Sequence, residues 1–215
     1  MQITHLGHAC VLVDIDGTRL LIDPGTMSTP QDAGGDVDAI LFTHSHVDHL
    51  DVPAVQDLVS AHLPKMLVAD ADSAQTLAEA RITDVDTVDS PDGARLEVAG
   101  VAVDVTTVPH ATIHCDLPGL SNNTYLINDA ILHPGDAFWT PSQPVDVLLL
   151  PIGGPWMKLS EAVEYLRAVA PRVAIPIHQG GLAPAHRELH TGLLRKLGPP
   201  DTEVRTLEQG QPTSV

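Results

Sequence analysis

The order of the predicted secondary structure indicates an α/β protein in which two sheets pack face to face with helices outside. Short strands dominate the first part of the chain. Strands and helices then alternate, and the last elements follow a strand–helix–strand–helix order. No low-complexity linker and no fixed-period repeat divides the 215 residues. A single domain over residues 1–215 is therefore the simplest description.

The predicted strands are short apolar or alternating runs bounded by turn-forming residues. They are residues 2–6, 10–15, 19–22, 39–42, 66–69, 85–88, 95–98, 101–108, 124–127, 130–133, 145–150 and 173–177. Asp16-Gly17 is typical of a tight hairpin turn between two of these strands. The uninterrupted apolar run at 145–150 favours a strand that is buried on both faces.

Four amphipathic segments are predicted to be helices, at residues 53–61, 73–80, 160–170 and 184–197. Asp51 is a candidate N-cap for the first helix. Ser160 and Glu164 suggest a capping box at the start of the third, although their spacing is one residue longer than the ideal. Gly198 is expected to end the last helix.

The composition is that of a globular protein. Hydrophobic residues make up 43% of the chain and aromatic residues only 3%, so the core must be aliphatic. No apolar run approaches the ~18 residues of a membrane span, and the first residues lack the pattern of a signal peptide. Two cysteines do not make a disulfide scaffold, and Cys115 is expected to be a buried, inert thiol. These features predict a cytoplasmic protein that does not insert into membranes.

The net charge of −17 argues against nucleic acid as the natural partner, because nucleic-acid sites need clustered Lys and Arg. The 11 Lys and Arg residues are scattered along the chain. A small-molecule substrate is the expected partner. An anionic substrate is not excluded by the net charge, since bound metal ions would supply local positive charge.

Four metal-ligand side chains fall within the segment Thr-His-Ser-His-Val-Asp-His, residues 43–49. Alternate residues of an extended segment point to the same side, so His44 and His46 can reach one ion together. The chain must then turn, which lets Asp48 and His49 face a second ion. Imidazole and carboxylate ligands suit Zn, Mn, Fe or Ni, and burying these groups without a metal would be costly.

Three later residues fit the same site. His110, Asp136 and His178 each lie just past the end of a predicted strand. Strand ends on one rim of a sandwich would bring these side chains together. The sequence therefore predicts a metal centre built from seven residues.

This pattern resembles the metallo-β-lactamase superfamily, which combines a His-x-His-x-Asp-His run with a later His, Asp and His in the same order. The resemblance covers nearly the whole chain. It extends to small bacterial hydrolases related to the ascorbate-6-phosphate lactonases and to the N-acyl-phosphatidylethanolamine phospholipase D group. Their first strand is similar to residues 3–9, and their Pro-Ile-Gly-Gly segment is similar to residues 151–154. The resemblance implies a four-layer αβ/βα sandwich.

The resemblance also implies the metal ligands and the reaction. The first ion would bind His44, His46 and His110, the second would bind Asp48, His49 and His178, and Asp136 would bridge both. The expected cofactor is two divalent ions, with zinc as the first candidate and Mn, Fe or Ni as alternatives. These ions would share a hydroxide that attacks a small-molecule ester, lactone, thioester or phosphodiester. A metal-dependent hydrolase is therefore predicted.

A few residues are expected to take part in the reaction in other ways than by binding metal. Asp48 is expected to orient the attacking water as well as to bind metal. The proton donor to the leaving group is left open between His8, His114 and Tyr125.

The side chains that support the ligands are also left open. Each histidine ligand needs an acceptor for its second ring nitrogen, and Asp14, Asp23 and Asp104 are the candidates. Trp156 and Met157 either form an apolar pocket wall or pack at the start of a helix.

Three alternative functions compete with that of a small-molecule hydrolase. A nuclease of the same fold would be expected to carry a large inserted domain and basic surfaces. A glyoxalase-type thioesterase would be expected to add a C-terminal helical domain, and few residues follow His178. A non-catalytic metal-binding homologue would be expected to have lost metal ligands, whereas all seven are present here.

Overall fold

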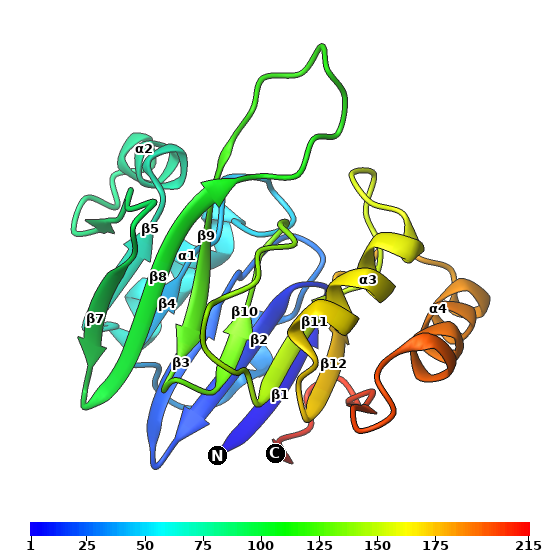
Figure 1. Cartoon of the computed structure of the whole chain (residues 1–215). Coiled ribbons are helices and arrows are strands. Elements are labelled where there is room, and N and C mark those ends of the chain that lie inside the picture. The colour runs from blue at the N-terminus through cyan, green and yellow to red at the C-terminus, as the bar shows by residue number, and fades with distance from the viewer.

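Two seven-stranded sheets lie face to face, and helices cover the outer face of each one (Figure 1). This computed structural model describes residues 1–215. In spatial order the first sheet contains β14 (Thr213–Ser214), β1 (Gln2–Gly7), β2 (Cys10–Ile15), β3 (Thr18–Ile22), β4 (Ala39–Leu41), β5 (Met66–Ala69) and β6 (Asp86–Thr87). The second sheet contains β13 (Glu203–Val204), β12 (Val173–Ile177), β11 (Val147–Pro151), β10 (Ile131–His133), β9 (Ser121–Ile127), β8 (Val101–Pro109) and β7 (Ala94–Val98).

Each sheet is apolar on both faces, and this property produces the four layers. In β2, Val11 and Val13 face the second sheet, whereas Cys10 and Leu12 face the helices. Successive side chains of a strand point to opposite faces, so both faces of such a sheet must be covered. The outer faces are covered by α1 (Val52–His62) and α2 (Ala71–Glu79) on the first sheet and by α3 (Leu159–Val169) and α4 (Pro184–Leu197) on the second. The predicted αβ/βα sandwich is confirmed.

The hairpin turn predicted at Asp16-Gly17 is present. Ile15 pairs with Thr18, and the two loop residues between them have φ of 52° and 92°. Positive φ at both central residues is the geometry of a type I′ turn, which matches the twist of the flanking strands.

The start of α3 differs from the prediction. The N-cap is Lys158, and its backbone N–H donates to the Glu161 carboxylate at 2.6 Å. Ser160 therefore lies inside the first turn, and the predicted capping box of Ser160 and Glu164 is wrong. A capping box requires the acidic residue three positions after the N-cap, and Glu164 lies four positions after Ser160. The spacing therefore already argued against this pair.

The residues after α4 add a short strand to each sheet. β13 pairs in parallel with β12, and β14 pairs antiparallel with β1. Neither was predicted, because strands of two residues carry no readable periodicity. The two chain ends consequently lie close together (Figure 1). No helix in the structure combines the length and apolar character needed to cross a lipid bilayer.

Strand direction brings the functional loops to one edge. β10, β11 and β12 run parallel, and β8 has the same direction because both it and β10 pair antiparallel with β9. The loops that follow β8, β10 and β12 therefore leave the second sheet at the same edge. The loop after β8 rises well above both sheets in Figure 1.

Gly25 allows the loop after β4 to pack closely on the segment after β3. A Cβ atom at Gly25 would lie 1.8 Å from the carbonyl oxygen of Asp48 and 2.5 Å from the backbone nitrogen of His49. The backbone N–H of Asp51 also donates to the carbonyl of Pro24 at 3.0 Å. Only glycine fits at this position without displacing the backbone that carries the histidine motif.

Gly25→Ala is expected to lower the free energy of unfolding by about 1–3 kcal/mol, because the added methyl group overlaps the backbone of the next loop. The matched control is Gly192→Ala in α4, where an added Cβ meets no atom within 4 Å. This control should raise the stability by up to about 1 kcal/mol, since alanine favours helix. Urea unfolding midpoints measure both changes. An unchanged midpoint for Gly25→Ala would contradict the close approach.

Candidate metal centre

Two clusters of metal-ligand side chains lie next to each other at the loop edge of the sandwich. The first cluster consists of His44, His46, His110 and Asp136. The second cluster consists of His8, Asp48, His49 and His178. Within each cluster, one ligand atom from every member lies within 4.8 Å of the others. The structure thus brings together all seven residues that the sequence singled out, and it adds His8 to them.

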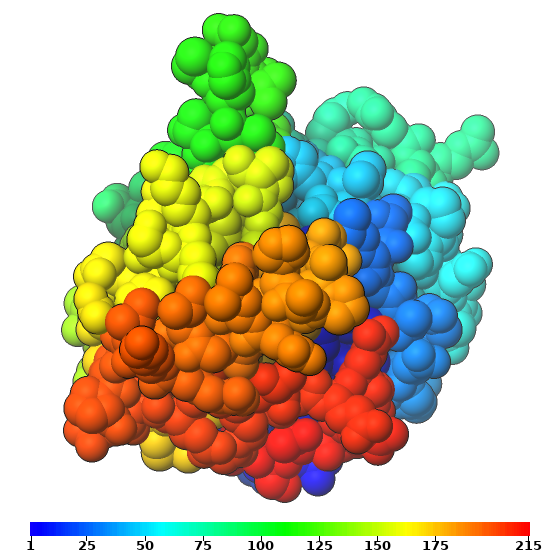
Figure 2. Space-filling view, turned by 90° about the vertical axis from the view of Figure 1, so that its right-hand side faces the viewer, coloured from blue at the N-terminus to red at the C-terminus, as the bar shows by residue number.

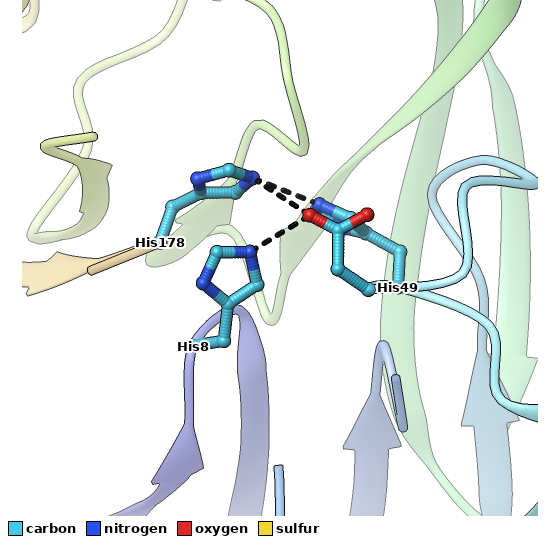
Figure 3. A group of neighbouring side chains, drawn as sticks. His8, His49 and His178 are labelled. Atoms are coloured by element: carbon cyan, nitrogen blue, oxygen red, sulfur yellow. Dashed lines mark hydrogen bonds and ion pairs between the residues drawn. The ribbon is translucent and has the colours of Figure 1, made fainter. Parts of the chain in front are cut away.

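Each cluster takes side chains from both sheets. The loop after β4 supplies His44, His46, Asp48 and His49, and the turn between β1 and β2 supplies His8. The second sheet supplies His110 after β8, Asp136 after β10 and His178 after β12. In Figure 3, His8, His49 and His178 point toward one another from three separate elements. The site therefore forms only when the two sheets are packed.

Asp136 lies between the two clusters. Its Oδ2 is 3.5 Å from Nε2 of His110 in the first cluster and 3.1 Å from Nε2 of His178 in the second. Its Oδ1 is 3.3 Å from Nε2 of His49. A single carboxylate is thus placed where both clusters can share it.

The ring nitrogens of His110 show that the first cluster suits a cation. Nδ1 of His110 donates to the carbonyl of Ala111 at 2.6 Å, so this nitrogen carries the proton and Nε2 has a free lone pair. Nε2 of His110 and Oδ1 of Asp136 are buried and have no hydrogen-bond partner. Buried polar atoms without partners are costly, and two acceptors facing one space are satisfied by a metal ion.

Asp23 orients the second cluster. Its Oδ2 accepts from Nδ1 of His49 at 2.7 Å and from the hydroxyl of Thr43 at 2.7 Å. Its Oδ1 accepts from the backbone N–H of Thr43 at 2.8 Å. Because Asp23 accepts from Nδ1, Nε2 of His49 is left as the ligand atom facing the site.

Asp23 is thus the carboxylate, among the three left open by the sequence, that supports a ligand. Asp14 instead accepts from the backbone N–H of Gly17 in the hairpin turn. Asp104 pairs with Arg95 on the surface.

Asn122 holds Asp136 in place, and sequence reasoning missed it. Oδ1 of Asn122 accepts from the backbone N–H of Asp136 at 2.9 Å, and its Nδ2 donates to the carbonyl of Pro134 at 2.9 Å. A Cβ at Gly135 would lie 2.1 Å from Oδ1 of Asn122, so glycine is needed between them. The available signal was the pair Asn122-Asn123 within β9, because asparagine is uncommon in strands and both side chains are fully buried.

His8 is held in one tautomer. The backbone N–H of Gly180 donates to its Nδ1 at 3.0 Å, so the ring proton lies on Nε2. Nε2 then donates to Oδ2 of Asp48 at 3.0 Å. A Cβ at Gly180 would approach Nδ1 of His8 to 2.8 Å, which explains the glycine there. His8 is therefore a hydrogen-bond donor to Asp48 rather than a free ligand.

The protonation states match a cation site. Burial lowers the pKa of His44 well below its ordinary value. Burial alone would raise the pKa of Asp136, but the facing imidazoles, above all that of His49, lower it well below its usual range. Burial lowers the pKa of His49, but the carboxylates of Asp136 and Asp23 outweigh it and raise this pKa well above its usual value. In the absence of a cation, the positive charge of a protonated His49 offsets the negative charges of Asp23 and Asp136. A bound metal ion would take over that role and release the proton.

A cavity opens on each side of the clusters. The larger, about 560 Å³, lies between the first cluster and the β8–β9 loop and is lined by His46, His110, Ala111, Thr112, Ile113, His114, Cys115, Leu117, Pro118, Gly119 and Leu120. The smaller, about 300 Å³, adjoins the second cluster and is lined by His8, Met27, Asp48, Gly153, Gly154, Pro155, His178, Gly181 and Leu182. A substrate bound across the clusters can extend into both cavities.

The remaining candidates differ in their placement. His114 lines the larger cavity, but 62% of its side chain is exposed and it touches neither cluster. Cys115 is exposed beside it, so the prediction of a buried thiol is wrong: the loop that carries it projects from the sheets. Tyr125 is buried, and its hydroxyl donates to the carbonyl of Phe42 at 2.6 Å, which removes it as a proton donor.

Trp156 packs against the site rather than lining either cavity. The centroid of its ring lies 6.3 Å from that of His110 and 5.9 Å from that of His178, both in edge-on arrangements. Met157 packs against the apolar layer beneath α3. Trp156 thus limits the movement of one histidine from each cluster.

The sequence matches the family model described as Beta-lactamase superfamily domain over residues 2–178, a span that contains all seven expected ligands. Protein Rv0786c of Mycobacterium tuberculosis is 41% identical over 210 residues, which cover 95% of this chain and 96% of that protein. The UPF0173 metal-dependent hydrolase MK1542 of Methanopyrus kandleri is 30% identical, with 98% of each chain covered.

A solved structure supports the same fold. Igni18, a metallo hydrolase from the archaeon Ignicoccus hospitalis, aligns with a TM-score of 0.76 and 20% identity, covering 99% of this chain and 97% of that one. The match to the family model and the similarity to the sequence relatives show the family as well as the fold. The chain belongs to the metallo-β-lactamase superfamily of metal-dependent hydrolases.

Proposed function

We propose that the protein is a dinuclear hydrolase of a small-molecule ester, lactone, thioester or phosphodiester. The observation that carries the proposal is Asp136, which lies within 3.5 Å of ligand atoms in both clusters. His44, His46 and His110 would hold one divalent ion, Asp48, His49 and His178 would hold the other, and Asp136 would be available to both. Zinc is the first candidate, and Mn, Fe and Ni suit the same ligands.

The two ions would supply an activated water as nucleophile and positive charge for the oxyanion that develops. Asp48 would bind the second ion and orient this water. Its Oδ2 accepts from Nε2 of His8 at 3.0 Å, and this hydrogen bond fixes the rotation of the carboxylate at the edge of the second cluster. Burial lowers the pKa of His8, so its ring remains neutral and keeps donating. His8 is therefore the positioning residue for Asp48. A neutral ring held in this hydrogen bond cannot also protonate the leaving group, so of the two candidate proton donors His114 is the one that we retain in the proposal.

Protein purified without added metal or chelator should contain about two equivalents of divalent metal, measured by elemental analysis. Asp136→Asn should lose at least one equivalent of metal, because the neutral amide of asparagine has no negative charge to offset the charge of two ions. It should also lower hydrolysis by at least about 100-fold. The control is Asp104→Asn, which removes a half-buried carboxylate of β8 that pairs with Arg95 and belongs to neither cluster.

Hydrolysis would be followed on chromogenic esters, a lactone, a thioester and a phosphodiester. Full turnover by Asp136→Asn would rule out the shared carboxylate. Metal-loaded wild-type protein that hydrolyses none of these compounds would instead support a non-catalytic metal-binding protein.

Asp23→Asn should weaken zinc binding about 10–100-fold, because the amide of asparagine carries no negative charge. It therefore makes a weaker hydrogen bond to Nδ1 of His49 and leaves Nε2 a weaker ligand. Asp14→Asn is the matched control, since Asp14 caps a surface turn and its replacement can still accept the same hydrogen bond. Competition with a chromogenic chelator measures both affinities. Equal affinities in the two variants would show that Asp23 does not act through His49.

His8→Ala should lower kcat about tenfold, the loss expected when one oriented hydrogen bond to Asp48 is removed. Metal content and KM should stay close to wild type. His8→Gln should recover much of the lost kcat, because its side-chain amide can donate to the same oxygen. Both variants place a non-glycine residue at the φ of 49° found for His8, so backbone strain cancels in the comparison. Equal losses of kcat in the two variants would argue against positioning by a hydrogen bond.

A further inference from the structure

The larger cavity is continuous with the first cluster and mostly apolar. Its walls include the cluster residues His46 and His110. The rest of the lining comes from the β8–β9 loop, which stands out from the body of the molecule in Figure 2. Ile113 and Leu117 of this loop are 37% and 53% exposed, respectively, although both are large and hydrophobic. A ligand that extends from the metal centre into this cavity would cover them.

Neither cavity contains a positive side chain. No Lys or Arg lines the larger cavity or the smaller one. The polar groups of the larger cavity, apart from the cluster histidines, are Thr112, His114 and Cys115, and the neighbouring Asp116 is exposed and acidic. A phosphate or carboxylate at the far end of a substrate would lose hydration there without gaining a partner.

The two cavities differ in the size of the group that each can take. The smaller cavity is bordered by Gly153, Gly154 and Gly181, with Asp48 and His178 at its inner end. The larger cavity, at about 560 Å³, lies within the range of about 300–1,000 Å³ that is typical of small-molecule sites. The longer arm of a substrate that reacts between the clusters therefore fits the larger cavity.

Building on the proposed function, we propose that the substrate carries a long, uncharged apolar arm that binds in the β8–β9 cavity. A neutral acyl or alkyl chain has the required chemistry, because the lining offers aliphatic surface and no counter-charge. A substrate whose long arm ends in a phosphate or carboxylate would be disfavoured. Any anionic group that the site accepts would have to lie at the clusters themselves.

Cys115 gives a direct measure of occupancy that does not depend on turnover. It lines the cavity and is exposed, whereas Cys10 is fully buried, so a maleimide should label Cys115 alone. In the metal-loaded protein, octanamide should slow labelling by N-ethylmaleimide in a saturable manner. The monoamide of suberic acid has the same chain length with a terminal carboxylate, and it should need about tenfold higher concentration. Because a carboxylate can also bind the metal ions, the two amides are compared in the metal-free protein as well, and equal or better protection by the anionic amide there would overturn the proposal.

Leu117→Lys tests whether charge sets this preference. A cationic side chain in the cavity should improve protection by the suberic monoamide relative to octanamide by about tenfold. Leu63→Lys is the matched control, because Leu63 is 77% exposed at the end of α1 and lines neither cavity. A shift of the same size in the control would show a general charge effect and contradict the assignment to this cavity.

The corresponding esters separate this proposal from the proposed function. The metal-loaded enzyme should hydrolyse 4-nitrophenyl octanoate with about tenfold higher kcat/KM than mono-4-nitrophenyl suberate. Equal kcat/KM values on the two esters would contradict the proposal of an apolar substrate arm but would still support the proposed hydrolysis of esters. Selective protection of Cys115 by octanamide without hydrolysis of either ester would support the cavity assignment and contradict the proposed hydrolysis of esters.

Discussion

Asp23 accepts three hydrogen bonds at the point where β3 ends, and the position of the histidine motif depends on them. Two come from the backbone and hydroxyl of Thr43, which fix the start of the loop after β4. The third comes from His49 at the other end of the motif. Because Asp23 is fully buried, losing the backbone N–H of Thr43 would leave Oδ1 without solvent or partner, whereas Oδ2 is shared by the other two donors. Gly25, two residues later, allows the same loop to pack against this segment.

The sequence predicted the metal-ligand residues more completely than the side chains that orient them. His110, Asp136 and His178 were identifiable because ligand-type residues directly after apolar strands meet at one edge of a sheet. The role of Gly180 could not be predicted, because its contact with His8 joins segments 172 residues apart in the chain. The asparagine pair in β9 marked Asn122 as unusual but did not identify Asp136 as its partner. The exposure of Cys115 was also missed, since composition does not show how far a loop projects.

Three site residues adopt backbone conformations that favour glycine. His8, Asp23 and His178 have φ of 49°, 49° and 59°. Each costs about 1–2 kcal/mol relative to ordinary backbone. The backbone N–H of His178 donates to the carbonyl of His8 at 2.8 Å, so two of these strained positions support each other across the sheets. The strain persists because the packed sandwich leaves these loops no alternative path.

Each cluster draws its members from both sheets, so an ion held there would also be a cross-link between them. A ligand that binds only the folded chain stabilises it by about 2.7 kcal/mol at 100 times its dissociation constant. Thermal stability would then rise with the concentration of free metal, even for a variant that cannot turn over substrate. Protein made during metal shortage would be more exposed to proteolysis, so the amount of folded enzyme would follow the metal supply of its surroundings.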